Sequence, residues 1–178
     1  ISGAGSNTTY YGMFLRYCDN AMEISQNKVT NARDFGIYFD RCDATAGTRG
    51  LTVNNFLHTN GSGVTYGIYT YLCNFQNIFY NNVHVTSSNA NSRAFYIQAG
   101  ANNNLLNNVL ANTGGGFAIY ATSSGALASS NHNDLFSTGT WLGHWTGSNV
   151  GDLAAWIAQS GRDNNSVSVN PLFYSDTD

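Results

Sequence analysis

The chain has 178 residues, enough for a single domain with a buried core, and carries a net charge of −3. Charged residues make up only 10% of the sequence and form no basic stretch that would neutralise phosphates, which argues against nucleic acid as a partner. No apolar run approaches the ~20 residues that a helix needs to span a bilayer, which argues against membrane insertion. Because neither an initiator methionine nor a signal-peptide pattern is present, we expect a mature or excised piece of a larger protein.

Five short segments with alternating side chains predict five β-strands. They span residues 11–15, 35–39, 66–70, 93–97 and 117–121. Because residues two apart share a face of a strand, Ile37, Phe39 and their counterparts are expected to point inward. On the outward face we expect a small residue followed by an aromatic one. The small residues are Gly12, Gly36, Gly67, Ala94 and Ala118, and the aromatic residues are Phe14, Tyr38, Tyr69, Tyr96 and Tyr120.

Each repeat also contains a second short apolar run and a short motif centred on asparagine. The asparagines stand at 27, 54, 81, 107 and 133, so the steps between them are 27, 27, 26 and 26 residues. A fixed period of ~20–50 residues indicates a repeat architecture, and no helical pattern interrupts these repeats. We therefore predict an all-β fold, a right-handed single-stranded parallel β-helix (a solenoid) of about five to six rungs over residues 1–136. Asparagine suits its tight turns, and stacked asparagines can pair their amides as an asparagine ladder.

The cysteines fit the same repeat. Cys18, Cys42 and Cys73 each lie six residues after the small residue of their strand, so they are expected to form one column. We expect reduced thiols that face the interior. A disulfide between neighbouring rungs is an alternative, although an odd count would leave one thiol unpaired, and the spacing is not that of a zinc site.

The period ends at Phe136, and residues 137–178 are expected to close the same domain. Asp152 resembles a helix N-cap, Leu153, Trp156 and Ile157 lie on one apolar face, and Gly161 stands where a helix would end. We predict a short helix over about 150–160 and a terminal strand over about 166–169, which cover an end or a flank of the solenoid.

The segments 131–139, 153–156 and 164–173 resemble a cassette that closes β-helix modules of the pectate-lyase-like superfold in large secreted or surface proteins of bacteria. The resemblance implies an extracellular or cell-surface location, with neighbouring modules of the same polypeptide as partners. Many members of the superfold are polysaccharide lyases or hydrolases and many have no known activity, so the resemblance implies no reaction.

The acidic residues offer one candidate metal site. Asp19 and Asp43 share a column that Asn74 continues, which suits weak calcium binding, although turn chemistry is the plainer interpretation. We otherwise predict no cofactor. The four histidines share no obvious column.

A second column pairs Arg16 with Asp40 and continues with Tyr71, Gln98 and Thr122. Its plain interpretation is a surface ion pair between rungs. Arg16 or Arg41 as the base of a lyase is an alternative, but no second carboxylate cluster supports it, and catalytic residues stay unknown.

The outward aromatic column is the stronger functional candidate. Sugar rings present an apolar face and a polar rim, which a strip of aromatic rings beside hydrogen-bonding groups would suit. The candidate carbohydrate-binding residues are Phe14, Tyr38, Tyr69, Tyr71, Tyr96 and Tyr120. Alternatively, these rings only stack on one another or lie beneath the closing segment or a neighbouring module. We predict a non-catalytic structural and adhesive module of a larger surface or secreted bacterial protein, for which glycan binding along the outward aromatic strip is a candidate role, with a polysaccharide lyase or glycoside hydrolase as the alternative.

Overall fold

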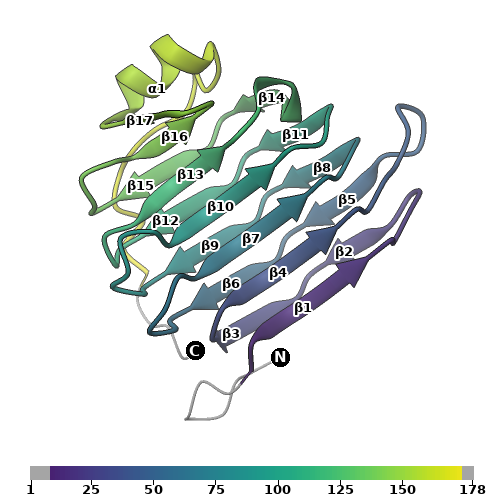
Figure 1. Ribbon diagram of the computed structural model, residues 1–178, viewed down its shortest axis with the longest axis horizontal. Helices are drawn as coiled ribbons and strands as arrows, with labels where there is room; N and C mark the ends of the chain where they lie inside the picture. The colour runs from purple at the N-terminus through teal and green to yellow at the C-terminus, as the bar shows by residue number, and fades with distance from the viewer. Residues whose placement is uncertain (1–8, 174–178) are drawn as a thin grey trace.

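The structure is a computed structural model that describes residues 9–173. The chain winds through five turns of a parallel solenoid, and each turn contributes one strand to each of three sheets (Figure 1). Sheet 1 contains β1 (Tyr11–Arg16), β4 (Phe35–Asp40), β7 (Tyr66–Tyr71), β10 (Arg93–Gln98), β13 (Phe117–Ala121), β16 (Gly143–Trp145) and β17 (Ser148–Val150). Sheet 2 contains β2 (Glu23–Ser25), β5 (Gly50–Val53), β8 (Gln76–Phe79), β11 (Asn103–Leu106) and β14 (Leu127–Asn131). Sheet 3 contains β3 (Lys28–Ala32), β6 (Phe56–Thr59), β9 (Asn82–Val85), β12 (Val109–Asn112) and β15 (Asp134–Ser137).

The five strands predicted from alternation are β1, β4, β7, β10 and β13. They pair in parallel and in that order, with Met13, Ile37, Ile68, Phe95 and Ile119 in register. This confirms the solenoid and its fold class. The strands of sheet 3, which follow the asparagine motif of each turn, were not predicted.

The turn between sheets 2 and 3 repeats one backbone conformation. Gln26, Asn54, Tyr80, Asn107 and His132 have φ between 54° and 58°, the left-handed region that asparagine tolerates better than most residues. The residue after each of them is an asparagine whose side chain bonds to the next turn or, for Asn133, to Asp163 of the closing segment. Asn55 Nδ2 donates to Asn81 Oδ1 at 2.9 Å, and Asn81 Nδ2 donates to Asn108 Oδ1 at 3.0 Å. The aligned asparagines are therefore 27, 55, 81, 108 and 133, which differs from the predicted alignment at two positions.

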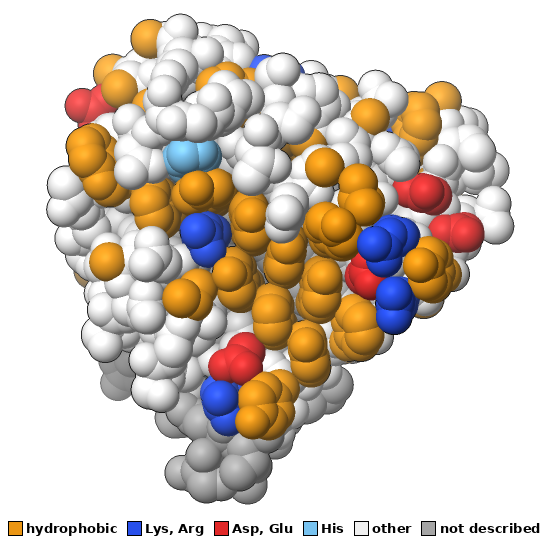
Figure 2. Space-filling model, viewed as in Figure 1, with side chains coloured by type: hydrophobic (Ala, Val, Ile, Leu, Met, Phe, Trp, Pro, Cys, Tyr) orange, Lys and Arg blue, Asp and Glu red, His pale blue; other side chains and the backbone are white. Residues whose placement is uncertain are grey.

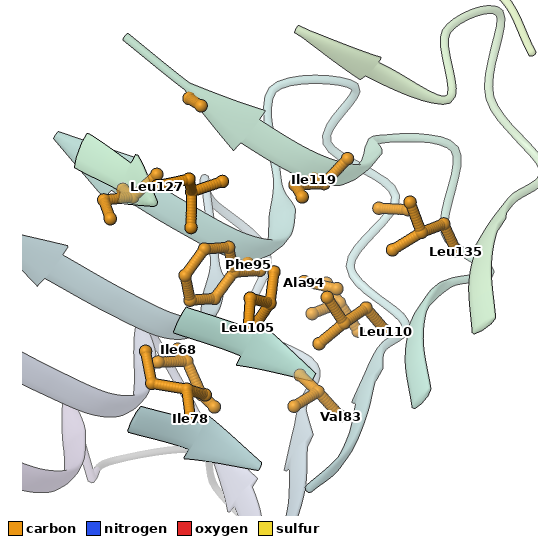
Figure 3. Close-up of a cluster of buried hydrophobic side chains, with 14 of the residues drawn as sticks. Ile68, Ile78, Val83, Ala94, Phe95, Leu105, Leu110, Ile119, Leu127 and Leu135 are labelled. Carbon is orange, nitrogen blue, oxygen red and sulfur yellow. The ribbon is translucent and has the colours of Figure 1, made fainter. Parts of the chain in front are cut away.

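Apolar side chains from all three sheets meet in a continuous core. Ile68 and Phe95 of sheet 1, Ile78 of sheet 2 and Val83 of sheet 3 are almost completely buried and point toward one another (Figure 3). Burial of this kind is the main stabilising contribution to a fold that consists of short strands.

The small residues do not lie on the outward face, and that prediction is wrong. Ala94 and the next residue, Phe95, are both 0% exposed and both point into the core, so the alternation breaks near the start of the strand. A Cβ atom at Gly67 would lie 2.1 Å from Val83 Cγ1 and 2.5 Å from the Ala94 carbonyl oxygen. The side chains of this column are small because they pack into the corner between sheets 1 and 3.

The closing segment covers the C-terminal end of the solenoid. The antiparallel pair β16–β17 continues sheet 1, and α1 (Leu153–Ser160) packs on it with Trp156 fully buried (Figure 1). The predicted caps are confirmed: Asp152 accepts a hydrogen bond from the Ala155 N–H, and Gly161 is left-handed with a φ of 67°. In place of the predicted strand over 166–169 there is a single parallel bridge between Val167 and Asp134.

Candidate functional site

The outward side chains of sheet 1 form an aromatic layer two columns wide. The first column is Tyr11, Phe35 and Tyr66, continued by Arg93 and Phe117. The second column is Phe14, Tyr38, Tyr69, Tyr96 and Tyr120, continued by His144 of β16. Figure 2 shows the layer as a band of hydrophobic side chains across this side of the molecule. We call it the aromatic face.

The rings of the aromatic face stack on one another along the solenoid. Tyr69 lies 4.6 Å from both Tyr38 and Tyr96, centroid to centroid, with interplanar angles of 8° and 18°. In the first column, Phe35 lies 4.9 Å from Tyr11 and 5.0 Å from Tyr66, each at 9°. This spacing follows from the distance between neighbouring strands, about 4.8 Å. The ring faces are therefore turned toward each other, and solvent meets mainly ring edges and hydroxyl groups.

The stacking changes between the fourth and fifth turns, where Arg93 replaces an aromatic residue. Its guanidinium lies 4.8 Å from the ring centroid of Tyr96 and 4.2 Å from that of Tyr120, a cation–π arrangement. The Tyr120 ring stands at 86° to the Tyr96 ring and stacks on His144 at 3.9 Å and 5°. One cation is thus held within the aromatic face.

Polar groups border the second column. Asp40 accepts from Arg16 Nε at 2.9 Å and from Arg41 Nη1 at 2.9 Å, so the predicted ion pair between rungs is present with a second arginine added. Gln98 Oε1 accepts hydrogen bonds from the hydroxyls of Tyr69 and Tyr96. The column of Arg16, Asp40, Tyr71 and Gln98 is in register as predicted.

The tyrosines are half-buried by their neighbours. Burial, followed by the proximity of Tyr96 and Tyr38, raises the pKa of the Tyr69 hydroxyl. Burial likewise raises the pKa of Tyr38 and of Tyr96. These hydroxyls are neutral at physiological pH; those of Tyr69 and Tyr96 donate to Gln98, so their oxygens are left to accept hydrogen bonds from a ligand.

In the part of the chain that the structure describes, the closing segment leaves most of the aromatic face open. It covers the end of the solenoid, and its tail runs along sheet 3, where Phe173 lies 4.6 Å from His84 and 5.9 Å from Phe56. Tyr11 and Phe14 of the first turn are 40% and 49% exposed, whereas Phe117 of the fifth turn is 6% exposed.

His58 and His84 share a column of sheet 3 with ring centroids 5.5 Å apart, so the prediction that the histidines share no column is wrong for this pair.

The candidate metal residues are brought together as a ladder of hydrogen bonds. Asp19 Oδ1 accepts the Asp43 N–H at 2.9 Å, and Asp43 Oδ1 accepts the Asn74 N–H at 3.1 Å and the Asn74 side-chain amide at 2.8 Å. These bonds fit the interpretation as turn chemistry, and a role as metal ligands stays a prediction. Within residues 9–173, no group of three or more His, Cys, Asp or Glu side chains is arranged to hold a metal ion.

The cysteines are reduced and form the predicted column. Cys42 and Cys73 are 0% exposed, and the Cys42 N–H donates to Cys73 Sγ at 3.4 Å. The hydrogen bond that it shares with Cys42, together with burial, raises the pKa of the Cys73 thiol. Cys18 lies in the first turn and is partly exposed.

A family model described as "Periplasmic copper-binding protein (NosD)" matches residues 1–137 of the 178-residue chain. The chain belongs to the NosD family. A search of the curated proteins and a search of the solved structures each gave no match. The NosD family is a right-handed parallel β-helix family, in agreement with the five turns described above.

Membership of the NosD family corrects one prediction and refines another. We predicted no cofactor, and this is wrong, because the family is described as copper-binding. The family is also described as periplasmic, which supports a location outside the cytoplasm and leaves a cell-surface location as a prediction. In the part of the chain that the structure describes, none of the helices has the length and apolar character needed to cross a membrane.

Proposed function

We propose that this solenoid is a non-catalytic module that binds an extended polysaccharide along its aromatic face. The observation that carries the proposal is the open two-column aromatic layer with hydrogen-bonding groups at its border. A large contiguous apolar patch on a soluble domain commonly marks an interaction surface. Paired charges at the border, such as Arg16 with Asp40, add polar groups without adding much net charge.

The stacked rings determine how a sugar chain would bind. Because the faces of Tyr38, Tyr69 and Tyr96 are turned toward each other, a sugar would contact ring edges and phenol hydroxyls across several turns. A pyranose ring matches this surface with its C–H groups and its hydroxyl rim. Affinity would be modest and spread over several rungs, and it would depend weakly on salt because no phosphate charge is neutralised.

A glycan array followed by calorimetry of the best neutral polysaccharide tests this. Tyr69→Phe/Tyr96→Phe keeps the stacked rings and removes two hydroxyls, and we expect it to weaken binding about tenfold, or ~1.4 kcal/mol. Tyr69→Ala/Tyr96→Ala should abolish binding. The matched control is Tyr80→Phe, an exposed tyrosine on a turn between sheets 2 and 3. Equal binding by the wild type and the double alanine variant would refute the proposal.

A depolymerisation assay separates binding from catalysis. If the domain released reducing ends or unsaturated sugars from a bound polysaccharide, the module would be an enzyme and the non-catalytic proposal would be wrong. Because Arg16 and Arg41 are both ion-paired with Asp40, neither side chain is positioned as a free base.

Copper(I) binding is a second candidate function, favoured by the family description and by the sulfur atoms of the first turn. Met13, Cys18 and Met22 are partly buried side chains that pack against the end of the core. Thioether and thiolate sulfur are soft donors that select Cu(I) over harder ions, so the chemistry of these three side chains suits copper in its reduced state. Burial raises the pKa of Cys18, so binding would release a proton and weaken as pH falls.

Competition with a chromogenic Cu(I) chelator tests this second candidate. Cys18→Ser and Met22→Leu should each lower Cu(I) affinity about tenfold or more. Ile24→Leu changes the same partly buried region without removing sulfur and serves as the control. X-ray absorption of the copper-loaded protein should report sulfur neighbours. Unchanged affinity in both sulfur variants would exclude this site.

A further inference from the structure

A polar hollow lies at the corner between sheets 3 and 1, beside the aromatic face. Its volume is about 500 Å³, and its lining includes Arg33, Asn60, Ser62, Thr86 and Ser88. The chain crosses this corner once in each turn. The first crossing takes two residues, 33–34, whereas the next two take six and seven, 60–65 and 86–92. The hollow exists because two neighbouring turns carry longer loops.

The two loops are tied to each other and to the first crossing, which fixes the walls of the hollow. Ser87 Oγ donates to the Gly63 carbonyl at 2.8 Å, and the Thr65 N–H donates to Ser92 Oγ at 3.0 Å. Gly61 packs so closely on the crossing below that a Cβ atom there would lie 1.9 Å from the Arg33 carbonyl oxygen. A ligand would therefore enter a preformed cavity and would not have to order the loops.

The charge of the hollow favours a neutral ligand. Arg33 is the charged residue of its lining, and its Nε lies 3.2 Å from Asp34 Oδ1, while its guanidinium stacks over the Tyr10 ring at 4.1 Å. The other polar lining groups are hydroxyls, a side-chain amide and backbone. A volume of about 500 Å³ lies within the range of small-molecule sites. These properties suit one or two hydroxyl-rich sugar units and do not suit an anion.

The hollow and the aromatic face share a border. Arg33 stands two residues before Phe35, and the loop 60–65 leads directly into Tyr66, so both first-column rings start where the hollow ends. We propose that the hollow binds a neutral single-sugar branch of a polysaccharide whose backbone lies on the aromatic face. This inference rests on the proposed polysaccharide binding and adds the class of ligand: a neutral, branched glycan.

The test compares neutral oligosaccharides that share a backbone and differ only in branching. Suitable pairs are a linear β-1,4-glucan with its xylose-branched counterpart, and a linear β-1,4-mannan with its galactose-branched counterpart. We expect the wild type to bind one branched member about tenfold more tightly than its linear partner. Ser62→Phe places a large side chain at the hollow, and it should remove this preference while leaving the affinity for the linear chain unchanged. Ser168→Phe, at an exposed position of the C-terminal tail, is the matched control.

The outcomes separate the two proposals. Equal affinity for branched and linear members, or a preference that survives in Ser62→Phe with an unchanged melting temperature, overturns the branch site and leaves the aromatic face as the binding surface. Binding of branch sugars without binding of linear chains supports the hollow and refutes the aromatic face. No binding to any member of either pair refutes both.

Discussion

Trp156 closes the solenoid, and its replacement tests how firmly the closing segment is attached. The side chain is 0% exposed and lies edge-on to Trp145 at 5.4 Å and 84°. Its Nε1 donates to Asp163 Oδ2 at 2.8 Å, and Asp163 Oδ1 accepts from Asn133 Nδ2 at 2.9 Å and from Ser166 Oγ at 2.7 Å. Trp156 therefore supports both the apolar end of the core and the carboxylate that ends the asparagine column.

Two substitutions separate these contributions. Trp156→Ala removes a buried tryptophan, which typically costs about 3–5 kcal/mol. Trp156→Phe keeps most of the apolar volume but removes the hydrogen bond to Asp163, and a bond to a charged group is worth about 1.5–3 kcal/mol. Since 1 kcal/mol lowers the melting temperature of a domain this size by about 2–4 °C, we expect losses of about 6–20 °C and about 3–12 °C respectively.

The assay is thermal and urea unfolding followed by circular dichroism. Trp141→Ala is the comparison variant, because Trp141 is 42% exposed and its loss should cost clearly less stability than the loss of the fully buried Trp156. If Trp156→Ala were no less stable than Trp141→Ala, α1 would be a loose appendage and the account of the closed end would be wrong.

Three further predictions concern the column residues. Thiol titration of the unfolded, unreduced protein should count three free cysteines, and only Cys18 should react in the native state; a count of one would mean a disulfide. The pKa of Tyr69 in the folded protein is raised above the unfolded value of about 10, so Tyr69 loses its hydroxyl proton at lower pH in the unfolded chain than in the folded one. The stability that the neutral hydroxyl contributes is therefore complete below about pH 10 and falls above it. Urea unfolding from about pH 8 to about pH 11 should therefore show a weaker decline in Tyr69→Phe than in the wild type, and identical declines would contradict the shift. Asn108→Ala leaves the buried N–H of Asn81 without its acceptor and should lower the free energy of unfolding by about 1–3 kcal/mol in the same assay. The control is Asn164→Ala at an exposed position, and an equal loss of stability in this variant would contradict a structural role for the asparagine column.

The sequence predicted the solenoid because its strongest signals repeat. Ile37 and Phe39 lie two residues apart on one face of a strand, and so do Ile68 and Thr70. The structure buries all four residues, as predicted. The alignment of asparagines failed at 54 and 107 for a local reason. Both positions belong to Asn-Asn pairs, and the first residue of each pair takes the left-handed conformation while the second bonds to the next turn. Composition alone does not distinguish the two roles.

The errors on sheet 1 have one common cause. Strict alternation places Gly36 and Gly67 outward, but the strand enters from a corner, and the small residue packs against sheet 3. This shift turns Phe35 and Tyr66 outward, so the aromatic face has a second column that the alternation hid. A signal was present: aromatic residues stand immediately before the small residue in four of the five strands, at 11, 35, 66 and 117.

The regular spacing of the solenoid also decides what kind of binding its aromatic face supports. In-register strands hold neighbouring rings at about the stacking distance, so the rings of Tyr38, Tyr69 and Tyr96 stack face to face whether or not a ligand is present. The stacking stabilises the fold, and the outward edges and hydroxyls remain for recognition. A hydroxyl deletion such as Tyr69→Phe therefore separates the two roles, since it leaves the stack intact and removes the hydroxyl that a ligand would contact, together with its hydrogen bond to Gln98. If polysaccharide affinity followed ring removal but not hydroxyl removal, the ligand would have to reach ring faces, and the stack would have to open to admit it.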